Sequence, residues 1–267
     1  MTKNIKVFHE VPFKLLYINR DYTDGEYCLP HLLDKNEYYR DYFYDAKKQG
    51  RYIIMDNSLH ELGSAYNTER LMYWINELKP NEFIVPDVWE DKTKSIQNAR
   101  SWATVSLPDG VTKVVVVQAK SLSEAIECTQ TYLDLGYKKI AYSYGASYYN
   151  DICPHPNKDL GKALGRLQVI STLYDMKLLL PSSRVHLLGC CVPQEFGWYE
   201  GIECIESIDT SNPVMAAIEK ILYEPHGLYS KPKVNMNQAQ GILMGDIDVD
   251  YYHHNMDMFK LINNLIK

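Results

Sequence analysis

Three aspartates follow short apolar runs that are typical of β-strands, and they are the side chains of this sequence best suited to chemistry. Asp56, Asp87 and Asp209 each come directly after a strand-like, mainly apolar run of four or five residues. A carboxylate at the carboxyl end of a parallel strand points into the mouth of an α/β barrel or sheet, where ligands bind. We therefore expect these three carboxylates to belong to one site.

Short β-branched runs alternate with longer amphipathic stretches from residue 50 onward. This alternation is typical of parallel βαβ units, in which a helix connects two parallel strands. Residues 114–117 are four consecutive valines, as expected for a strand buried on both faces. We predict strands over residues 51–55, 83–85, 113–118, 139–142, 184–188 and 204–208. We predict helices over residues 34–48, 68–78, 121–136, 162–174, 194–201, 213–222 and 251–267, and one from residue 91 toward a break at 108–110.

The chain is long enough and apolar enough to bury a full core. It has 267 residues, of which 46% are hydrophobic, and an α/β barrel occupies about 250 residues as one domain. We expect one domain over residues 1–267, with an irregular, β-rich start and an excursion over residues 225–250. No apolar run approaches the ~20 residues that span a bilayer, and residues 1–6 lack the apolar segment of a signal peptide. We expect a soluble, cytoplasmic protein with no membrane partner.

The cysteines indicate neither a metal knuckle nor a disulfide framework, because the six of them are scattered without C-x-x-C spacing. Reduced thiols are the simpler interpretation, and Cys190 and Cys191 are expected to pack as small apolar residues. Most of the 22 tyrosines are expected at the edge of the core, with the ring buried and the hydroxyl hydrated. Stacking of a few tyrosines on exposed bases is the other interpretation.

The net charge bears on nucleic-acid binding. A formal charge of −6 argues against indiscriminate coating of nucleic acid, because phosphate binding needs Lys and Arg concentrated on the contact face. A local basic patch is compatible with this total. The basic residues available for phosphates are Lys158, Lys162, Arg166, Lys231 and Lys233. They would form such a patch if they share the rim of the site.

Three groups of residues, taken in order, carry a family resemblance. They are residues 56–60, residues 83–102 with Asp87, and residues 186–189 followed by 201–202 and 208–213. Together they resemble the tRNA-guanine transglycosylase superfamily, which contains the queuine and archaeosine tRNA-ribosyltransferases. The resemblance implies an α/β fold, a (β/α)₈ TIM-like barrel with an irregular N-terminal segment and a closing C-terminal helix. It also implies a transferase that exchanges a guanine for a 7-deazaguanine, with phage and bacterial members acting on DNA.

The resemblance assigns a role to each matching position. Asp209 falls at the family's nucleophile and Asp56 at its general acid/base, whereas Asp87 and Gln118 match residues that hydrogen-bond the bound base. The other matching positions are Asn57 and Ser58 beside Asp56, His60 and Leu188 on the two faces of the base, Gly189 after Leu188, and the loop Ser143, Tyr144 and Gly145. The family has a glycine-rich loop where Ser143 and Tyr144 stand, so bulkier residues replace part of it here.

The expected chemistry needs no cofactor and no metal. The helix with His253 and His254 resembles the family's closing His-Asn helix, whose histidine completes a zinc site with a C-x-C-x-x-C element. Here Cys204 is the last cysteine, so a four-ligand zinc site is not expected. Neither a phosphate-binding G-x-x-x-x-G-K-[ST] nor a dinucleotide-binding G-x-G-x-x-G follows a predicted strand.

The expected partners are a polynucleotide and a free 7-deazaguanine base that is preQ0-like. DNA is favoured over tRNA, because the cysteines of the tRNA enzymes are missing and the sequence ends soon after the His-Asn helix. Two other classes stay open. A metal-dependent small-molecule lyase or isomerase would use Asp56, Asp87 and a histidine as ligands, and a non-catalytic barrel would only bind a modified base.

Overall fold

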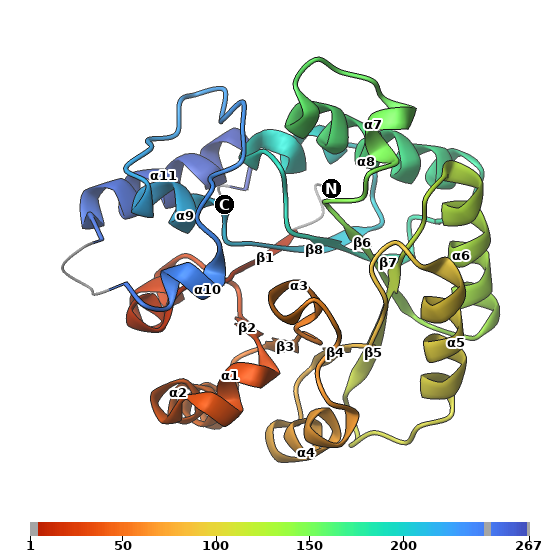
Figure 1. The fold of residues 1–267 in the computed structure, drawn as a ribbon, viewed down its shortest axis with the longest axis horizontal. Helices are drawn as coiled ribbons and strands as arrows, with labels where there is room; N and C mark the ends of the chain where they lie inside the picture. The colour runs from red at the N-terminus through yellow and green to blue at the C-terminus, as the bar shows by residue number, and fades with distance from the viewer. Residues whose placement is uncertain (1–4, 243–246, 266–267) are drawn as a thin grey trace.

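Eight parallel strands form one sheet in the computed structural model, which describes residues 5–242 and 247–265. The strand order is β1-β8-β7-β6-β5-β4-β3-β2, and every neighbouring pair is parallel. In Figure 1 the strands form a ring with helices outside it, which confirms the predicted TIM-like α/β barrel. The strands are β1 Lys6–His9, β2 Glu26–Cys28, β3 Ile53–Met55, β4 Glu82–Ile84, β5 Thr112–Val117, β6 Lys139–Ser143, β7 Arg184–Leu188 and β8 Ile205–Thr210.

The N-terminal segment supplies the first two strands of the barrel, joined by the short 3-10 helices η1 (Phe13–Leu15) and η2 (Ile18–Asp21). Asp24 N–H and Thr23 Oγ1, from the loop before β2, donate to the carbonyl of Val7 in β1 over 2.8 and 3.1 Å. The segment is β-containing and irregular, as predicted.

Several of the longer helices begin where the sequence offers a capping side chain. Asn67, Asp91, Ser121 and Asn157 each accept a hydrogen bond from a backbone N–H of the first helical turn. The helices that surround the barrel or cover its mouth are α1 Pro30–Lys35, α2 Glu37–Lys48, α3 Leu59–Leu62, α4 Thr68–Leu78, α5 Lys92–Ala103, α6 Leu122–Asp134, α7 Tyr149–Ile152, α8 Lys158–Asp175, α9 Asn212–Ile218, α10 Met236–Ala239 and α11 Val249–Ile262, with the 3-10 helix η3 over Pro193–Tyr199.

Several predicted boundaries are wrong for local reasons. The helix predicted over residues 34–48 is broken at Asn36, whose backbone is extended and whose side chain caps α2. The helix predicted from residue 162 begins at Lys158, because Asn157 caps it. The helix predicted over 194–201 is the 3-10 helix η3.

Helix α11 closes the barrel, as expected of the last helix. His253 Nδ1 lies 2.6 Å from the hydroxyl of Tyr22, and His254 Nε2 lies 3.0 Å from the carbonyl of Tyr223. The histidine pair thus joins α11 to the N-terminal segment and to the chain after α9. Helix α11 ends at Ile262, so the helix predicted up to residue 267 is too long over residues 263–265. Three stretches that the predictions covered lie outside the described residues: 1–4, 243–246 and 266–267. No described helix is both long and apolar enough to cross a membrane.

A layer of buried and partly buried ions lies in the barrel at the amino ends of the strands. Lys139 is 1% exposed, and its Nζ lies 2.7 Å from a carboxylate oxygen of Glu82 and 3.1 Å from one of Glu206. Arg184 contacts the same two carboxylates at 2.9 Å. A buried charge is tolerated when it is paired and hydrogen-bonded in this way. The layer lies at the amino ends of the strands, whereas the cavity described below lies at their carboxyl ends.

Candidate active site at the carboxyl ends of the strands

One cavity gathers most of the residues singled out from the sequence. Its empty volume, which includes open solvent at the mouth, is about 970 Å³. Ten of the twelve predicted site residues line it: Asp56, Asn57, His60, Asp87, Gln118, Ser143, Tyr144, Leu188, Gly189 and Asp209. They come from six strands or the loops after them, because the carboxyl ends of parallel strands meet at one end of a barrel.

The remaining two predicted residues, Ser58 and Gly145, lie behind the cavity wall. Ser58 is fully buried, and its hydroxyl lies 2.8 Å from Nδ1 of His31. Gly145 packs against the ring of Trp89, so closely that a Cβ would stand 3.0 Å from it. Both residues therefore support lining residues rather than face a ligand.

Asp56 is held by hydrogen-bond donors from two places in the fold, the turn after β3 and strand β2. The backbone N–H of Ser58 donates to its Oδ2 over 3.0 Å, and the hydroxyl of Tyr27 also donates to it. Desolvation raises the pKa of Asp56 to about 6, the negative charge of Asp209 adds to the rise, and the backbone N–H groups of Asn57 and Ser58 oppose it. A carboxyl group of this kind can give or take a proton near neutral pH.

Asp209 lies inside β8, which continues to Thr210 instead of ending at residue 208 as predicted. Its Oδ1 is 2.9 Å from Nε2 of His186 and accepts the backbone N–H of Gly189 over 3.4 Å. Burial raises the pKa of Asp209 to about 7, and the hydrogen bond from Gly189 opposes this rise. No hydrogen bond to Oδ2 is found within the described part of the chain, so one oxygen is held and the other is left to the cavity.

Asp87 is the centre of a hydrogen-bonded set of side chains. Its Oδ1 accepts from Nδ2 of Asn57 over 2.7 Å, and its Oδ2 accepts from Nε2 of Gln118 over 2.6 Å. The amide oxygen of Gln118 accepts a hydrogen bond from the backbone N–H of Glu90, so the orientation of the amide is determined. Gln118 does not cap α6, because Ser121 does. Burial raises the pKa of Asp87 to about 6, and the two amide hydrogen bonds oppose the rise. These groups present an ordered polar edge suited to a heterocycle.

Aromatic side chains line the side of the cavity that faces solvent. His60 is exposed, and its ring centroid lies 6.1 Å from that of Tyr144. The ammonium group of Lys231 lies 4.4 Å from the Tyr144 centroid and donates to the Tyr144 hydroxyl. Leu188, the predicted partner of His60 across a base, lines the same cavity. A flat ring would meet aromatic and apolar surface here.

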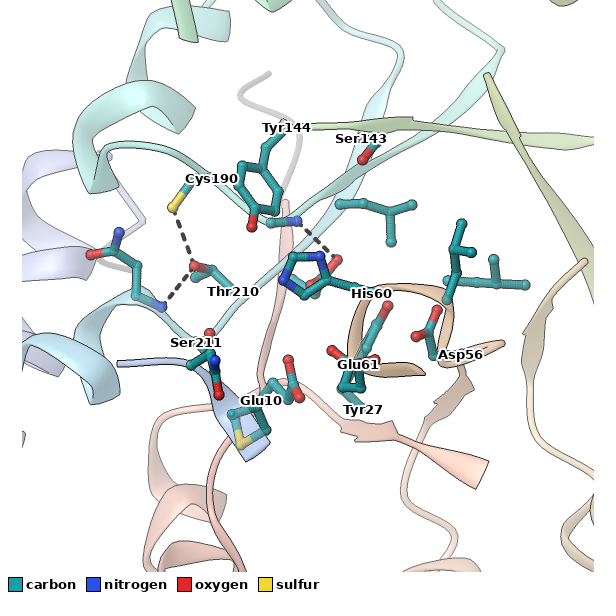
Figure 2. A pocket seen from close by; sticks show the side chains of 18 of the residues that line it. Glu10, Tyr27, Asp56, His60, Glu61, Ser143, Tyr144, Cys190, Thr210 and Ser211 are labelled. Carbon is teal, nitrogen blue, oxygen red and sulfur yellow. Dashed lines mark hydrogen bonds between the residues drawn. The ribbon is translucent and has the colours of Figure 1, made fainter. Parts of the chain in front are cut away.

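The sequence did not single out two further carboxyl groups in the cavity. Figure 2 shows Glu10 and Glu61 around the same space as Asp56 and His60. Burial and the neighbouring Asp56 raise the pKa of Glu61 to about 8, and burial together with Glu61 raises the pKa of Glu10 well above its ordinary range. Glu10 comes just after β1, so the rule that found the three aspartates applies to it as well. Glu61 lies in the short helix α3 and has no such signal.

Comparison of the chain with protein-family models and with curated proteins finds no match.

Five basic residues were predicted to be available for phosphates, and for Arg166 this prediction is wrong. It is fully buried, and its Nε donates to Glu195 over 2.6 Å. Lys158 and Lys233 are exposed, and Lys231 is at the cavity itself. The basic rim is thus smaller than the sequence suggested.

The alternative class, a metal-dependent lyase or isomerase, needs side chains that bind a metal ion. Within residues 5–242 and 247–265, no three His, Cys, Asp or Glu side chains are placed to share a metal ion. Cys190 and Cys191 are buried, and burial raises the pKa of the Cys191 thiol to about 12. This agrees with packing rather than nucleophilic use of the two cysteines.

Proposed function

We propose that this chain exchanges guanine in a nucleic acid for a 7-deazaguanine base through a covalent aspartyl-sugar intermediate, with DNA preferred to tRNA. The observation that supports it best is that Asp56 and Asp209 line one cavity, beside an ordered polar edge formed by Asp87 and Gln118. Base exchange at a sugar carbon requires a nucleophile on one side and a proton donor near the leaving base.

In the first half of the reaction, Asp209 acts as the nucleophile. Its Oδ2 bonds to C1′ of the target nucleotide as the bond from C1′ to N9 of guanine breaks, through a transition state with oxocarbenium character. The electron pair of that bond goes to the departing base, and the carboxyl group of Asp56 supplies the proton. The products are a sugar ester of Asp209, neutral guanine and the carboxylate of Asp56.

In the second half, the incoming base reverses these events. The Asp56 carboxylate takes the proton from N9 of the 7-deazaguanine, N9 bonds to C1′, and the ester bond to Asp209 breaks. The electron pair returns to the Asp209 carboxylate. Nothing is oxidised or reduced, and both carboxyl groups end in their starting states.

The environment of each group suits its role. Asp56 has its pKa raised to about 6, so a useful fraction is protonated near neutral pH. The target guanine lies in a stack, and extruding it costs on the order of a few kcal/mol. His60 and Leu188 offer surface for the extruded ring, and Asp87 with its two amide partners offers hydrogen bonds to its polar edge.

The test is release of labelled guanine from DNA or from tRNA in the presence of a 7-deazaguanine. We expect release with wild-type protein, a mass adduct of sugar on Asp209, and neither with Asp209→Asn. Asp109→Asn, at an exposed loop position, is the matched control and should behave as wild type. Release from neither polymer across several bases would contradict the proposal. Activity abolished by a chelator would favour a metal-dependent enzyme, and function that survives Asp209→Asn would favour a base-binding protein.

A further inference from the structure

A continuous series of buried contacts links the ionic layer of the barrel to the side chain of Asp209. Lys139 Nζ lies 2.7 Å from Oγ of Ser207, and the same oxygen lies 2.7 Å from Nδ1 of His186. Nε2 of His186 lies 2.9 Å from Oδ1 of Asp209. Lys139, Ser207 and His186 are each 1% exposed, so water does not compete for these contacts.

The direction of each hydrogen bond follows from the lysine. An ammonium group has three N–H donors and no acceptor, and Lys139 has three acceptors around it, Glu82, Glu206 and Ser207. Ser207 Oγ therefore accepts from Lys139, which leaves the hydroxyl hydrogen of Ser207 for its other neighbour, Nδ1 of His186. A nitrogen that accepts carries no hydrogen, so the hydrogen of a neutral imidazole stands on Nε2 and faces Asp209.

A charged His186 would not fit this pattern. An imidazolium would donate from Nδ1, and Ser207 would then accept from both Lys139 and His186. Burial, with the nearby charge of Lys139, lowers the pKa of His186 to about 3. The neutral form is thus favoured by both the contacts and the environment.

We propose that His186 and Ser207 are positioning residues for the nucleophile Asp209. Lys139 orients the hydroxyl of Ser207, and Ser207 selects the form of His186 that carries its hydrogen on Nε2. That N–H holds Oδ1 of Asp209, so that Oδ2 is presented to C1′. The catalytic part of this inference rests on the proposed function, whereas the protonated nitrogen of His186 is a property of the protein without substrate.

The arrangement has two consequences for Asp209. With the N–H groups of His186 and Gly189 both on Oδ1, the carboxylate cannot rotate freely, and Oδ2 remains the attacking atom. Donors to a carboxylate also favour its ionised form, which is the nucleophilic one. The barrel interior thereby counteracts part of the desolvation that raises the pKa of Asp209.

The first test is nitrogen NMR of protein with ¹⁵N-labelled histidine at pH 7, with the signals of His186 assigned from the spectrum of His186→Gln. We expect a protonated Nε2 and an unprotonated Nδ1 in the wild type. A protonated Nδ1, alone or together with Nε2, would overturn the inference whatever the enzyme activity proves to be.

The second test is the rate of adduct formation in a single turnover. Ser207→Ala should slow it by about 10-fold, the order of one lost hydrogen bond, and should give a mixture of His186 tautomers. Ser207→Thr keeps the hydroxyl and should stay within about 3-fold of wild type. The affinity for free guanine should be the same in all three proteins, because Asp87 and Gln118 are untouched.

An unchanged rate in Ser207→Ala, or a loss matched by an equal loss of guanine affinity, would overturn the positioning role. If the wild type forms no adduct with any polymer, the proposed function fails, and the tautomer measured by NMR still decides the hydrogen-bond series.

Discussion

The backbone N–H of Gly189 donates to Oδ1 of Asp209 over 3.4 Å, so the turn after β7 reaches the carboxylate of β8. Gly189 has a φ of +59°, and a Cβ at this position would stand 2.4 Å from the ring of Tyr144. The guanidinium group of Arg166 donates to the carbonyls of Leu188 and Gly189 over 2.9 and 2.8 Å. Asp209, Tyr144 and Arg166 therefore all contact the turn at Gly189.

Replacement of Gly189 by alanine should damage both stability and the site. The positive φ alone costs an L-residue about 1–2 kcal/mol, and the clash with Tyr144 adds to it. Gly201→Ala is the matched control, since Gly201 has a φ of +86° and open space around its Cβ position. Urea unfolding should show a clearly larger loss for Gly189→Ala than for Gly201→Ala. Equal losses would mean that Tyr144 moves away at no cost.

Glu61 should make the protein less stable as the pH rises. Its pKa is about 8 in the folded protein against an ordinary value of 4.5, so the folded state binds more protons than the unfolded state between these values. Stability then falls from about pH 4.5 to pH 8. Glu61→Gln should be more stable than wild type at pH 8.5 by about 1 kcal/mol or more, or roughly 2–4 °C in Tm, and little different at pH 4.5. Glu69→Gln, at an exposed position, should show no such difference.

The rate of adduct formation should have a bell-shaped pH profile. The reaction needs Asp209 ionised and Asp56 protonated, and burial raises their pKa values to about 7 and about 6. The rate should rise with pH as Asp209 ionises and fall as Asp56 loses its proton, with the maximum between about pH 6 and pH 7. Because the two carboxyl groups interact, the measured pKa values belong to the pair. A profile that is flat from pH 5 to pH 8.5 would contradict the assigned roles.

Loss of the Gln118 amide should weaken binding of the free base. Gln118→Ala removes the donor to Oδ2 of Asp87 and leaves that buried oxygen without it. We expect about 10-fold weaker guanine binding, the order of one lost hydrogen bond. Quenching of Trp89 fluorescence can report binding, since Trp89 lines the cavity. Gln97→Ala, on the exposed face of α5, should bind as wild type does.

Arg166 should be required for folding rather than for phosphate binding. Arg166→Met leaves Glu195, which is fully buried, without its cation, and breaking such a pair costs about 3–5 kcal/mol. The double variant Arg166→Met with Glu195→Gln should recover part of that loss in denaturant unfolding. If Arg166→Met kept full stability and lost only polynucleotide affinity, the sequence-based expectation of a phosphate contact would be right after all.

Much of the barrel could be predicted because its local signals are strong. The four valines of β5 and the capping side chains before α4, α5 and α6 depend only on neighbours in sequence. The break at Asn36 and the early start of α8 at Asn157 also have local signals, which the apolar periodicity concealed. The position of β1 and β2 was harder to see, since these strands are four and three residues long and gain their stability from β8 and β3.

Local patterns were enough to place Asp56, Asp87 and Asp209 at or near the carboxyl ends of buried strands, because strand periodicity and apolar runs are properties of consecutive residues. The groups that surround them follow from the closed barrel: Glu10 and Glu61 in the same cavity, the buried state of Arg166, and the series from Lys139 to Asp209. Burial and hydrogen-bond partners depend on residues that lie far apart in the chain and meet only when the barrel closes. These same contacts determine the pKa of each carboxyl group and the oxygen of Asp209 that is left to react.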